Sequence, residues 1–90
     1  MFCDLHMHST ASDGTDAPGD LAAIARAAGL DAIALTDHDT TTGLAACGLA
    51  CAAAGVTFIP GIELSADITA LRRPLADGQR MGTLHILGLF

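Results

Sequence analysis

The chain has 90 residues, a formal net charge of −6, four arginines and no lysine. This acidic balance argues against nucleic-acid binding through a basic patch, and a phosphate-bearing substrate would need bound cations to invert the local field. With 51% apolar and only 16% charged residues, the composition also argues against disorder and is typical of one small domain.

The three cysteines, Cys3, Cys47 and Cys51, give an odd count without a C-x-x-C motif, which favours a reducing cytoplasm over a disulfide framework. The first residues lack the basic and apolar regions of a signal peptide. No apolar run approaches the roughly 20 residues that span a bilayer. We therefore expect a cytoplasmic protein with no membrane partner.

The first half of the chain predicts a strand over Phe2–His8, a polar loop and a helix that begins at Asp16 or Ala17, with Pro18 in its first turn. This helix would end at Gly29. Its predicted apolar stripe consists of Leu21, Ile24, Ala25 and Ala28.

A buried strand is expected over residues 31–36, followed by a polar loop and a second helix over about 42–54 that ends at Gly55. Cys47 and Cys51 share a face of that helix with Leu44 and Ala54. We interpret both cysteines as core packing and not as a redox or metal site.

A third strand over residues 56–59 is predicted to be interrupted by Pro60-Gly61 before 62–64, and an irregular segment over 67–81 contains the solvated pair Arg72 and Arg73. A fourth, apolar strand follows over 83–90. The order β-α-β-α-β predicts an α/β fold with a parallel sheet and right-handed crossovers. The helices would cover one face only, so we expect the domain to continue past Phe90.

Two histidines end the first strand. Because residues i and i+2 of a strand point to the same side, His6 and His8 present two imidazoles in one direction. Such a pair suits zinc, manganese or iron. The alternative is two surface histidines at a strand end.

His38 follows the second strand in the segment Thr-Asp-His-Asp-Thr over residues 36–40. Sites in parallel α/β sheets form outside the carboxyl ends of the strands, so His38 is expected on the same edge as His8. The alternative is a turn in which Asp39 or Thr40 helps to cap the second helix.

Glu63 is the only glutamate of the chain and is expected at the end of the third strand in apolar surroundings. A charged carboxylate is costly to bury there without a partner, and a bridging role between metal ions would provide one. The alternative is an exposed edge residue. His85, in the fourth strand, is either a satisfied core histidine or a further ligand.

All four histidines and the single glutamate are thus predicted near one edge, and Asp13 lies in a loop that could fold over it. Together they could hold two or three cations that activate water and clamp phosphoryl oxygens. Other chemistries are not indicated, because the chain has no P-loop, no dinucleotide-binding glycine motif and no G-x-S-x-G elbow.

Four motifs in this order resemble the PHP domain (polymerase and histidinol phosphatase) over nearly the whole chain: Asp4-Leu5-His6-Met7-His8-Ser9, Ser12-Asp13-Gly14, Leu35-Thr36-Asp37-His38-Asp39-Thr40 and Pro60-Gly61-Ile62-Glu63-Leu64-Ser65. The resemblance implies that residues 1–90 are the N-terminal β-α-β-α-β part of a distorted barrel of seven β/α units. Ligands from the C-terminal half of that barrel would come from outside the chain or from another copy of it.

The resemblance also implies a trinuclear centre. His6 and His8 would hold the first ion, Asp13 and His38 the second, and Glu63 would bridge the first and the third, which His85 would join. Manganese is the favoured ion, with zinc, iron or magnesium as alternatives. Asp37 is the candidate catalytic residue, since it could orient His38.

The Ser-Asp-Gly form at Asp13 resembles the stand-alone branch of the family, which removes the 3′-phosphate from nucleoside 3′,5′-bisphosphates or trims short RNA. We therefore expect a metal-dependent phosphoesterase acting on nucleotides or short oligoribonucleotides through a metal-activated hydroxide. The alternatives are a PHP proofreading or accessory module of a DNA polymerase and a non-catalytic metal-binding fragment.

Overall fold

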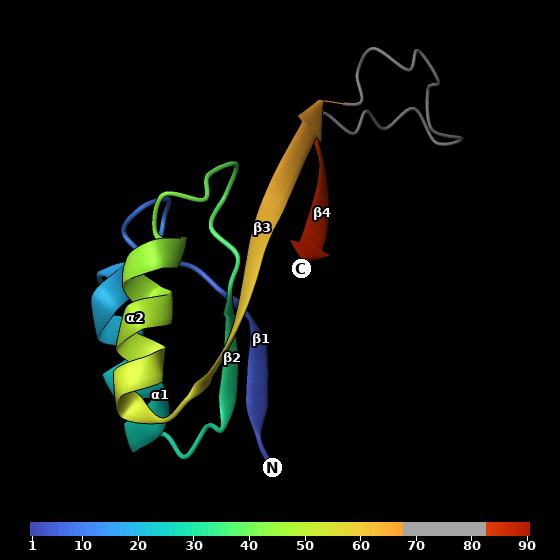
Figure 1. The fold of residues 1–90 in the computed structure, drawn as a ribbon. Helices are drawn as coiled ribbons and strands as arrows, with labels where there is room; N and C mark the ends of the chain where they lie inside the picture. The colour runs from blue at the N-terminus through green and yellow to red at the C-terminus, as the bar shows by residue number, and fades with distance from the viewer. Residues whose placement is uncertain (68–82) are drawn as a thin grey trace.

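The computed structural model describes residues 1–67 and 83–90. One four-stranded sheet has the order β1-β2-β3-β4, in which the first three strands are parallel and β4 runs antiparallel to β3. The α/β class is confirmed, and the sheet is mixed because its last strand returns beside the third. The elements are β1 (Cys3–Met7), the 3-10 helix η1 (Pro18–Asp20), α1 (Leu21–Ala27), β2 (Ala32–Leu35), α2 (Leu44–Ala54), β3 (Thr57–Asp67) and β4 (Thr83–Leu89) (Figure 1).

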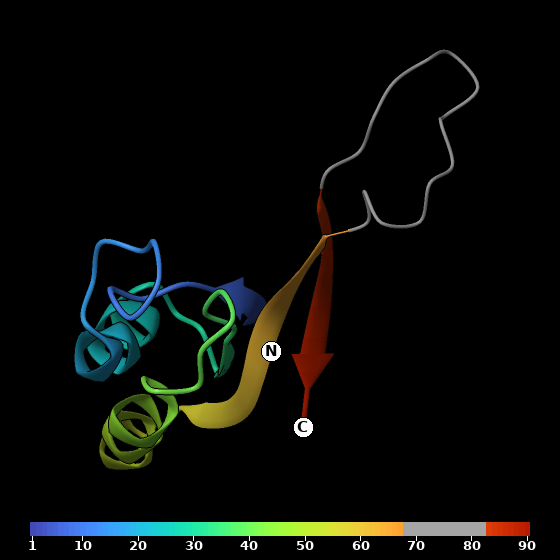
Figure 2. The ribbon, with the colours of Figure 1, turned by 90° about the horizontal axis from the view of Figure 1, so that it is seen from above.

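The two α-helices lie on one side of the sheet, and β4 forms the far edge (Figures 1 and 2). The prediction that the helices cover a single face is therefore confirmed. The predicted loop pair Arg72 and Arg73 falls outside the described residues.

Strand β3 differs from the prediction, because it continues through Pro60-Gly61 without a break. Its first part pairs with β2 up to Pro60, and its second part pairs with β4 from Gly61 onward. The Pro60 carbonyl accepts a hydrogen bond from the Phe90 amide, so Pro60 faces the last pairs of the β4 ladder. A proline is tolerated at such a ladder end, where the missing N–H removes little pairing.

Both α-helices end as predicted at glycines with left-handed backbone, Gly29 with φ 81° and Gly55 with φ 74°. The first helix departs from the prediction in its start and in its buried face. Proline opens a 3-10 turn before α1 begins at Leu21, and Ile24 is 43% exposed. The two-turn helix buries Leu21, Ala22 and Ala25 against its neighbours, so the true stripe is rotated toward Ala22.

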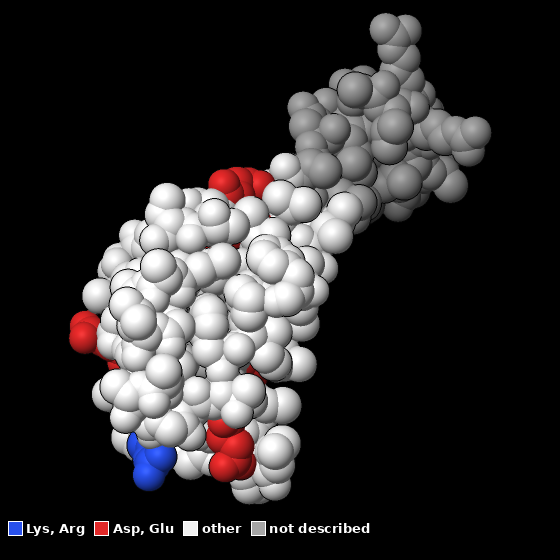
Figure 3. Space-filling model, in the orientation of Figure 1, with Lys and Arg blue, Asp and Glu red and all other residues white. Residues whose placement is uncertain are grey.

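Charge is sparse on the face shown in Figure 3, where the basic atoms occupy one spot at the end at which β1 and β2 begin. Arg26 is the only lysine or arginine among the described residues. Its guanidinium donates to the carbonyl of Ala54 at the end of α2. No helix of the described part of the chain is long and apolar enough to cross a membrane.

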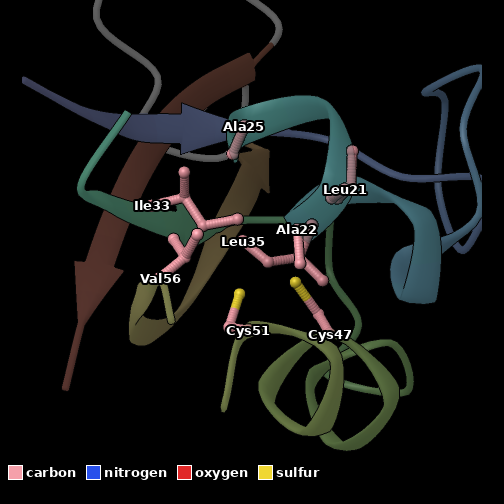
Figure 4. Packing of buried hydrophobic residues seen from close by; sticks show 8 residues of the cluster. All are labelled: Leu21, Ala22, Ala25, Ile33, Leu35, Cys47, Cys51 and Val56. Atoms are coloured by element: carbon pink, nitrogen blue, oxygen red, sulfur yellow. The ribbon is translucent and has the colours of Figure 1, made fainter. Parts of the chain in front are cut away.

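The core lies between β2 and the helices (Figure 4). Ile33 and Leu35 of β2 are fully buried, and so are Cys47 and Cys51 of α2. The interpretation of these cysteines as core packing is thus confirmed. Strand β2 pairs with β1 on one side and with β3 on the other, and the helices pack against it. This arrangement fixes the positions of the strand ends that carry the candidate site.

Within the described part of the chain, strand β4 has apolar side chains exposed on both faces. Ile86 and Leu87 are 48% and 43% exposed. Consecutive strand residues point to opposite faces, so neither face of β4 is packed against another part of the described chain.

Candidate metal centre

Strand β1 contains an irregularity at the first candidate ligand. Three residue steps from Asp4 to Met7 match only two steps of β2, from Ile33 to Leu35, so β1 carries one extra residue. The Asp4 carboxylate accepts a hydrogen bond from the backbone amide of His6, 3.1 Å away. Bulges of this kind re-aim a side chain next to functional sites.

The Glu63 carboxylate is the centre of the cluster. Its Oε1 lies 2.5 Å from Nε2 of His6 and 3.0 Å from Nε2 of His8. Its Oε2 lies 2.9 Å from Nδ1 of His85 and 3.4 Å from Nδ1 of His38. Four imidazoles from different parts of the sheet therefore meet at one carboxylate, and at 5% exposure Glu63 is buried and not an exposed edge residue.

Asp13 closes the cluster on the loop side. Its Oδ1 lies 2.8 Å from Nδ1 of His8, and its Oδ2 lies 3.2 Å from Nε2 of His38. The Asp13 side chain is 62% exposed, so the loop holds it over the sheet edge and not inside the fold.

The cluster contains three groups of donor atoms within 4.8 Å of one another: His6, His8 and Glu63; His8, Asp13 and His38; and His38, Glu63 and His85. Imidazole nitrogen and carboxylate oxygen are donors that zinc, manganese and iron accept. A neutral imidazole has one free lone pair. His8 and His38, which each belong to two groups, can therefore serve one ion apiece.

Electrostatics keeps both carboxylates charged. Burial favours the neutral form of Glu63, but hydrogen bonds with His6 and His8 and the positive charge of His38 outweigh it and lower its pKa to about 2. For Asp13, desolvation is likewise outweighed by the charge of His38 and the hydrogen bond with His8, so its pKa is lowered. Ionised carboxylates are the form that binds cations.

Asp37 lies apart from this cluster of imidazoles. Its carboxylate accepts hydrogen bonds from Ser9 and Ser12, and the expected contact with the His38 ring is not among the hydrogen bonds of the described residues. The Asp37 backbone carbonyl accepts from the Glu63 amide at 3.0 Å, so this segment is tied to β3 through its main chain.

Sequence reasoning missed three supporting residues: Ser9, Ser12 and Asp39. Asp39 has φ 54°, which is uncommon for a residue other than glycine, and its Oδ1 accepts from the Ser65 amide at 2.8 Å. The alternative of Asp39 as a helix cap is wrong, since Gly43 is the N-cap of α2 and no side chain caps it. Aspartate adopts the left-handed backbone conformation more readily than most residues, and this preference was the only feature of the sequence that indicated such a conformation at Asp39.

An α/β sheet with clustered imidazoles and carboxylates at the carboxyl ends of its parallel strands defines an α/β domain with a candidate polynuclear metal site. The family model described as "PHP domain" matches residues 4–88. The chain therefore belongs to the PHP domain family.

Curated relatives are named for reactions at phosphate esters. The chain is 44% identical over 64 residues, or 71% of its length, to a 5′-3′ exoribonuclease of Haemophilus influenzae. It is 40% identical over 89 residues, or 99% of its length, to a phosphoribosyl 1,2-cyclic phosphate 1,2-diphosphodiesterase of Eggerthella lenta. It is 40% identical over 86 residues, or 96% of its length, to a 3′,5′-nucleoside bisphosphate phosphatase of Chromobacterium violaceum.

Solved structures share the fold. An amidohydrolase from Chromobacterium violaceum with bound sulfate matches 99% of the chain at a TM-score of 0.79 and 37% identity, with 28% of that structure covered. A protein of Bifidobacterium adolescentis assigned to the metal-dependent phosphoesterases matches 97% of the chain at a TM-score of 0.76 and 31% identity, with 27% covered. The chain spans 23%, 30% and 26% of the three curated relatives.

Proposed function

We propose that this chain carries the metal-binding edge of a phosphoesterase that hydrolyses phosphate esters of nucleotides or short oligoribonucleotides. The observation that carries the proposal is the meeting of four imidazoles and the Asp13 loop around one buried carboxylate, Glu63. We assign His6, His8 and Glu63 to a first ion, Asp13 and His38 to a second, and Glu63 with His85 to a third. This assignment uses each imidazole once.

The substrate class is inferred from charge and from the relatives. Arg26, the only basic side chain among the described residues, lies at the opposite end of the sheet from the cluster. Divalent ions, for which we favour manganese, would supply the positive charge for a phosphoryl group and would activate water for attack on it. The relatives named as an exoribonuclease and a nucleoside bisphosphate phosphatase favour nucleotide or RNA substrates.

The chain's own residues have definite tasks in this scheme. The carboxylates of Glu63 and Asp13 stay charged at neutral pH, in keeping with their lowered pKa values. Glu63 contacts all four imidazoles and can space the first and third ions, and Asp13 contacts His8 and His38 at the second ion. We also propose that the chain is the N-terminal part of a PHP domain. Additional ligands would come from outside it, because the three ions of this assignment have only three, two and two donors among the described residues.

The first test is metal stoichiometry by elemental analysis after chelation and reloading with Mn²⁺. We expect two or three ions per chain in the wild type and at least one fewer in His6→Ala, with Asp20→Ala as an exposed control away from the cluster. A folded chain that retains no manganese would mean that the ligands from outside the chain are essential and that this chain alone is not an enzyme. A His6→Ala chain that retains all of the manganese would contradict the assignment.

The second test is phosphate release from a nucleoside 3′,5′-bisphosphate by the manganese-loaded chain. Release that disappears in Glu63→Gln supports a phosphoesterase. Metal binding without release from this or any oligoribonucleotide substrate would instead support the alternative of a non-catalytic metal-binding fragment.

A further inference from the structure

The Asp37 carboxylate is a buried charged group that has no place in the proposed ligand set. It is 2% exposed. Its Oδ1 accepts from the Ser9 amide at 2.6 Å and from the Ser12 hydroxyl at 2.9 Å, and its Oδ2 accepts from the Ser9 hydroxyl at 2.7 Å. Burying a charged carboxylate costs free energy unless hydrogen bonds compensate for the lost hydration. Loss of any one of these bonds would therefore destabilise the buried group.

These bonds hold the loop that contains Asp13. The carbonyl of Ser9 accepts from the amides of Ser12 and Gly14, at 3.0 and 2.8 Å. Asp37 therefore fixes Ser9 and Ser12, which precede Asp13, through its carboxylate. The Ser9 carbonyl in turn fixes Gly14, which follows Asp13. The candidate ligand lies between two fixed points of the loop.

The loop is also packed tightly against the end of β1. A Cβ placed on Gly14 would lie 2.3 Å from the carbonyl oxygen of His8. With its backbone held this closely, the exposed Asp13 side chain reaches the ring nitrogens of both His8 and His38.

We propose that Asp37 is a positioning residue that fixes the loop of residues 9–14, so that Asp13 stands between His8 and His38. This inference rests on the proposed metal centre. It refines the expected role of Asp37, which acts through the backbone of the neighbouring loop and not through the His38 ring. Its effect should be largest on the ion that depends on Asp13, because Asp13 is the candidate ligand that this loop carries.

The experiment is a calorimetric titration of the metal-free full chain with Mn²⁺. The variants are Asp13→Asn, Asp37→Ala, Asp37→Asn and the double variant Asp13→Asn/Asp37→Ala. Asp31→Ala is the matched control, because the Asp31 carboxylate also accepts a backbone amide, that of Phe2, but before the start of β2. Circular dichroism of each metal-free variant checks that it is folded.

For Asp37→Ala we expect the ion that is lost in Asp13→Asn to bind roughly 10- to 100-fold more weakly, as for other residues that orient metal ligands. Asp37→Asn keeps the shape and one acceptor oxygen, so it should restore most of the affinity. In the Asp13→Asn background, Asp37→Ala should change nothing further, because the residue through which it acts is already gone.

Three results would overturn the role. They are unchanged affinity in Asp37→Ala, an equal loss in Asp37→Asn, and a further loss in the double variant, which would show that Asp37 acts on the ions without Asp13. If the wild type binds no Mn²⁺, the proposed function fails and the positioning role fails with it. If instead the wild type binds and Asp37→Ala does not differ, only the positioning role fails.

A milder variant keeps the inference testable if Asp37→Ala does not fold. Ser12→Ala removes one bond to Asp37, together with the longer contact of 3.4 Å between the same hydroxyl and Asp13 Oδ1, and leaves the Ser9 bonds in place. It should weaken the same ion in the same direction, by less than about 10-fold. An unchanged Asp13-dependent ion in a folded Ser12→Ala chain would count against the role.

Discussion

At the scale of single residues, the charge of Glu63 depends on its imidazole neighbours. Its pKa is about 2, against about 4.3 for an unperturbed glutamate. A carboxyl whose folded pKa is depressed stabilises the fold above its unfolded pKa, and that contribution is lost as the pH falls toward the folded value.

We therefore predict that the metal-free wild type loses stability steeply between about pH 4.3 and pH 2. Glu63→Gln, which has no such titration, should show a flatter profile over the same range. Urea unfolding at a series of pH values measures both profiles. Parallel profiles would mean that the imidazoles do not stabilise the Glu63 carboxylate.

Two glycines give a matched pair of substitutions. Gly14→Ala would place a methyl group 2.3 Å from the His8 carbonyl oxygen, whereas at Gly19 nothing lies within 4 Å of an added Cβ. We expect Gly14→Ala to cost about 1–3 kcal/mol, as other overpacked sites do. Gly19→Ala should stay within about 0.5 kcal/mol of the wild type.

The midpoint of urea unfolding decides this pair. Because the strain falls on the loop of Asp13, Gly14→Ala should also weaken the Asp13-dependent Mn²⁺ ion. If Gly14→Ala left stability and metal binding unchanged, the loop would not be packed tightly against the His8 carbonyl.

At the scale of elements, helix α2 buries two thiols that face the core. Burial, with the negative charge and hydrogen bonding of Cys51, raises the pKa of Cys47 to about 12, and burial raises that of Cys51. Cys3 is exposed on β1. We predict that at pH 8 one thiol reacts rapidly with a disulfide reagent and two react only after denaturation, because the thiolate is the reactive form.

Stopped-flow absorbance counts the thiols in each phase. Cys3→Ser should abolish the rapid reaction and leave the two thiols that react only after denaturation. Rapid reaction of all three thiols in the native chain would contradict the packing of α2.

The elements differ in how far sequence alone could predict them. The ends of both helices could be predicted from Gly29 and Gly55, which adopt the left-handed backbone that ends a helix. The parallel arrangement of β1, β2 and β3 follows from the alternation of strands and helices along the chain. The continuity of β3 through Pro60 does not, because it depends on β4 ending beside that proline. The buried face of α1 also depends on tertiary packing, which exposes Ile24 and buries Ala22.

The candidate site shows the same division. His6, His8, His38 and Glu63 could be grouped from strand periodicity and the strand-end rule, and the structure brings them together. The hydrogen bonds between Asp37 and Ser9 could not be predicted, because they join residues 28 positions apart and one of them lies in an irregular loop. The extra residue of β1 between Asp4 and Met7 also has no local signature in the sequence.

At the scale of the whole molecule, bound ions should stabilise the fold and hold its edge strand β4. Among residues 1–67 and 83–90, β4 pairs only with β3, and its apolar side chains are exposed on both faces. An ion at Glu63 and His85 would join β4 to the ligands of β1 and of the β2 end. At 100 times its dissociation constant, one such ion adds about 2.7 kcal/mol of stability.

We predict that Mn²⁺ raises the unfolding midpoint and slows hydrogen exchange of the β4 amides. His85→Ala should cancel the slowing in β4 while the amides of α2 keep their wild-type exchange. Hydrogen exchange followed by mass spectrometry resolves these segments. Protection of β4 that persists in His85→Ala would remove His85 from the ligand set.

The gathering of histidines around Glu63 also bears on the order of folding events. His6 and His8 stand 57 and 55 positions before their glutamate partner, so none of these contacts can form within one local segment. Closing a loop of this length costs conformational entropy before the contacts that offset it have formed, and non-local pairing is slow for that reason. A metal added during refolding should then find its ligands only after the three parallel strands have docked, so the appearance of tight Mn²⁺ binding would mark the completion of the native sheet.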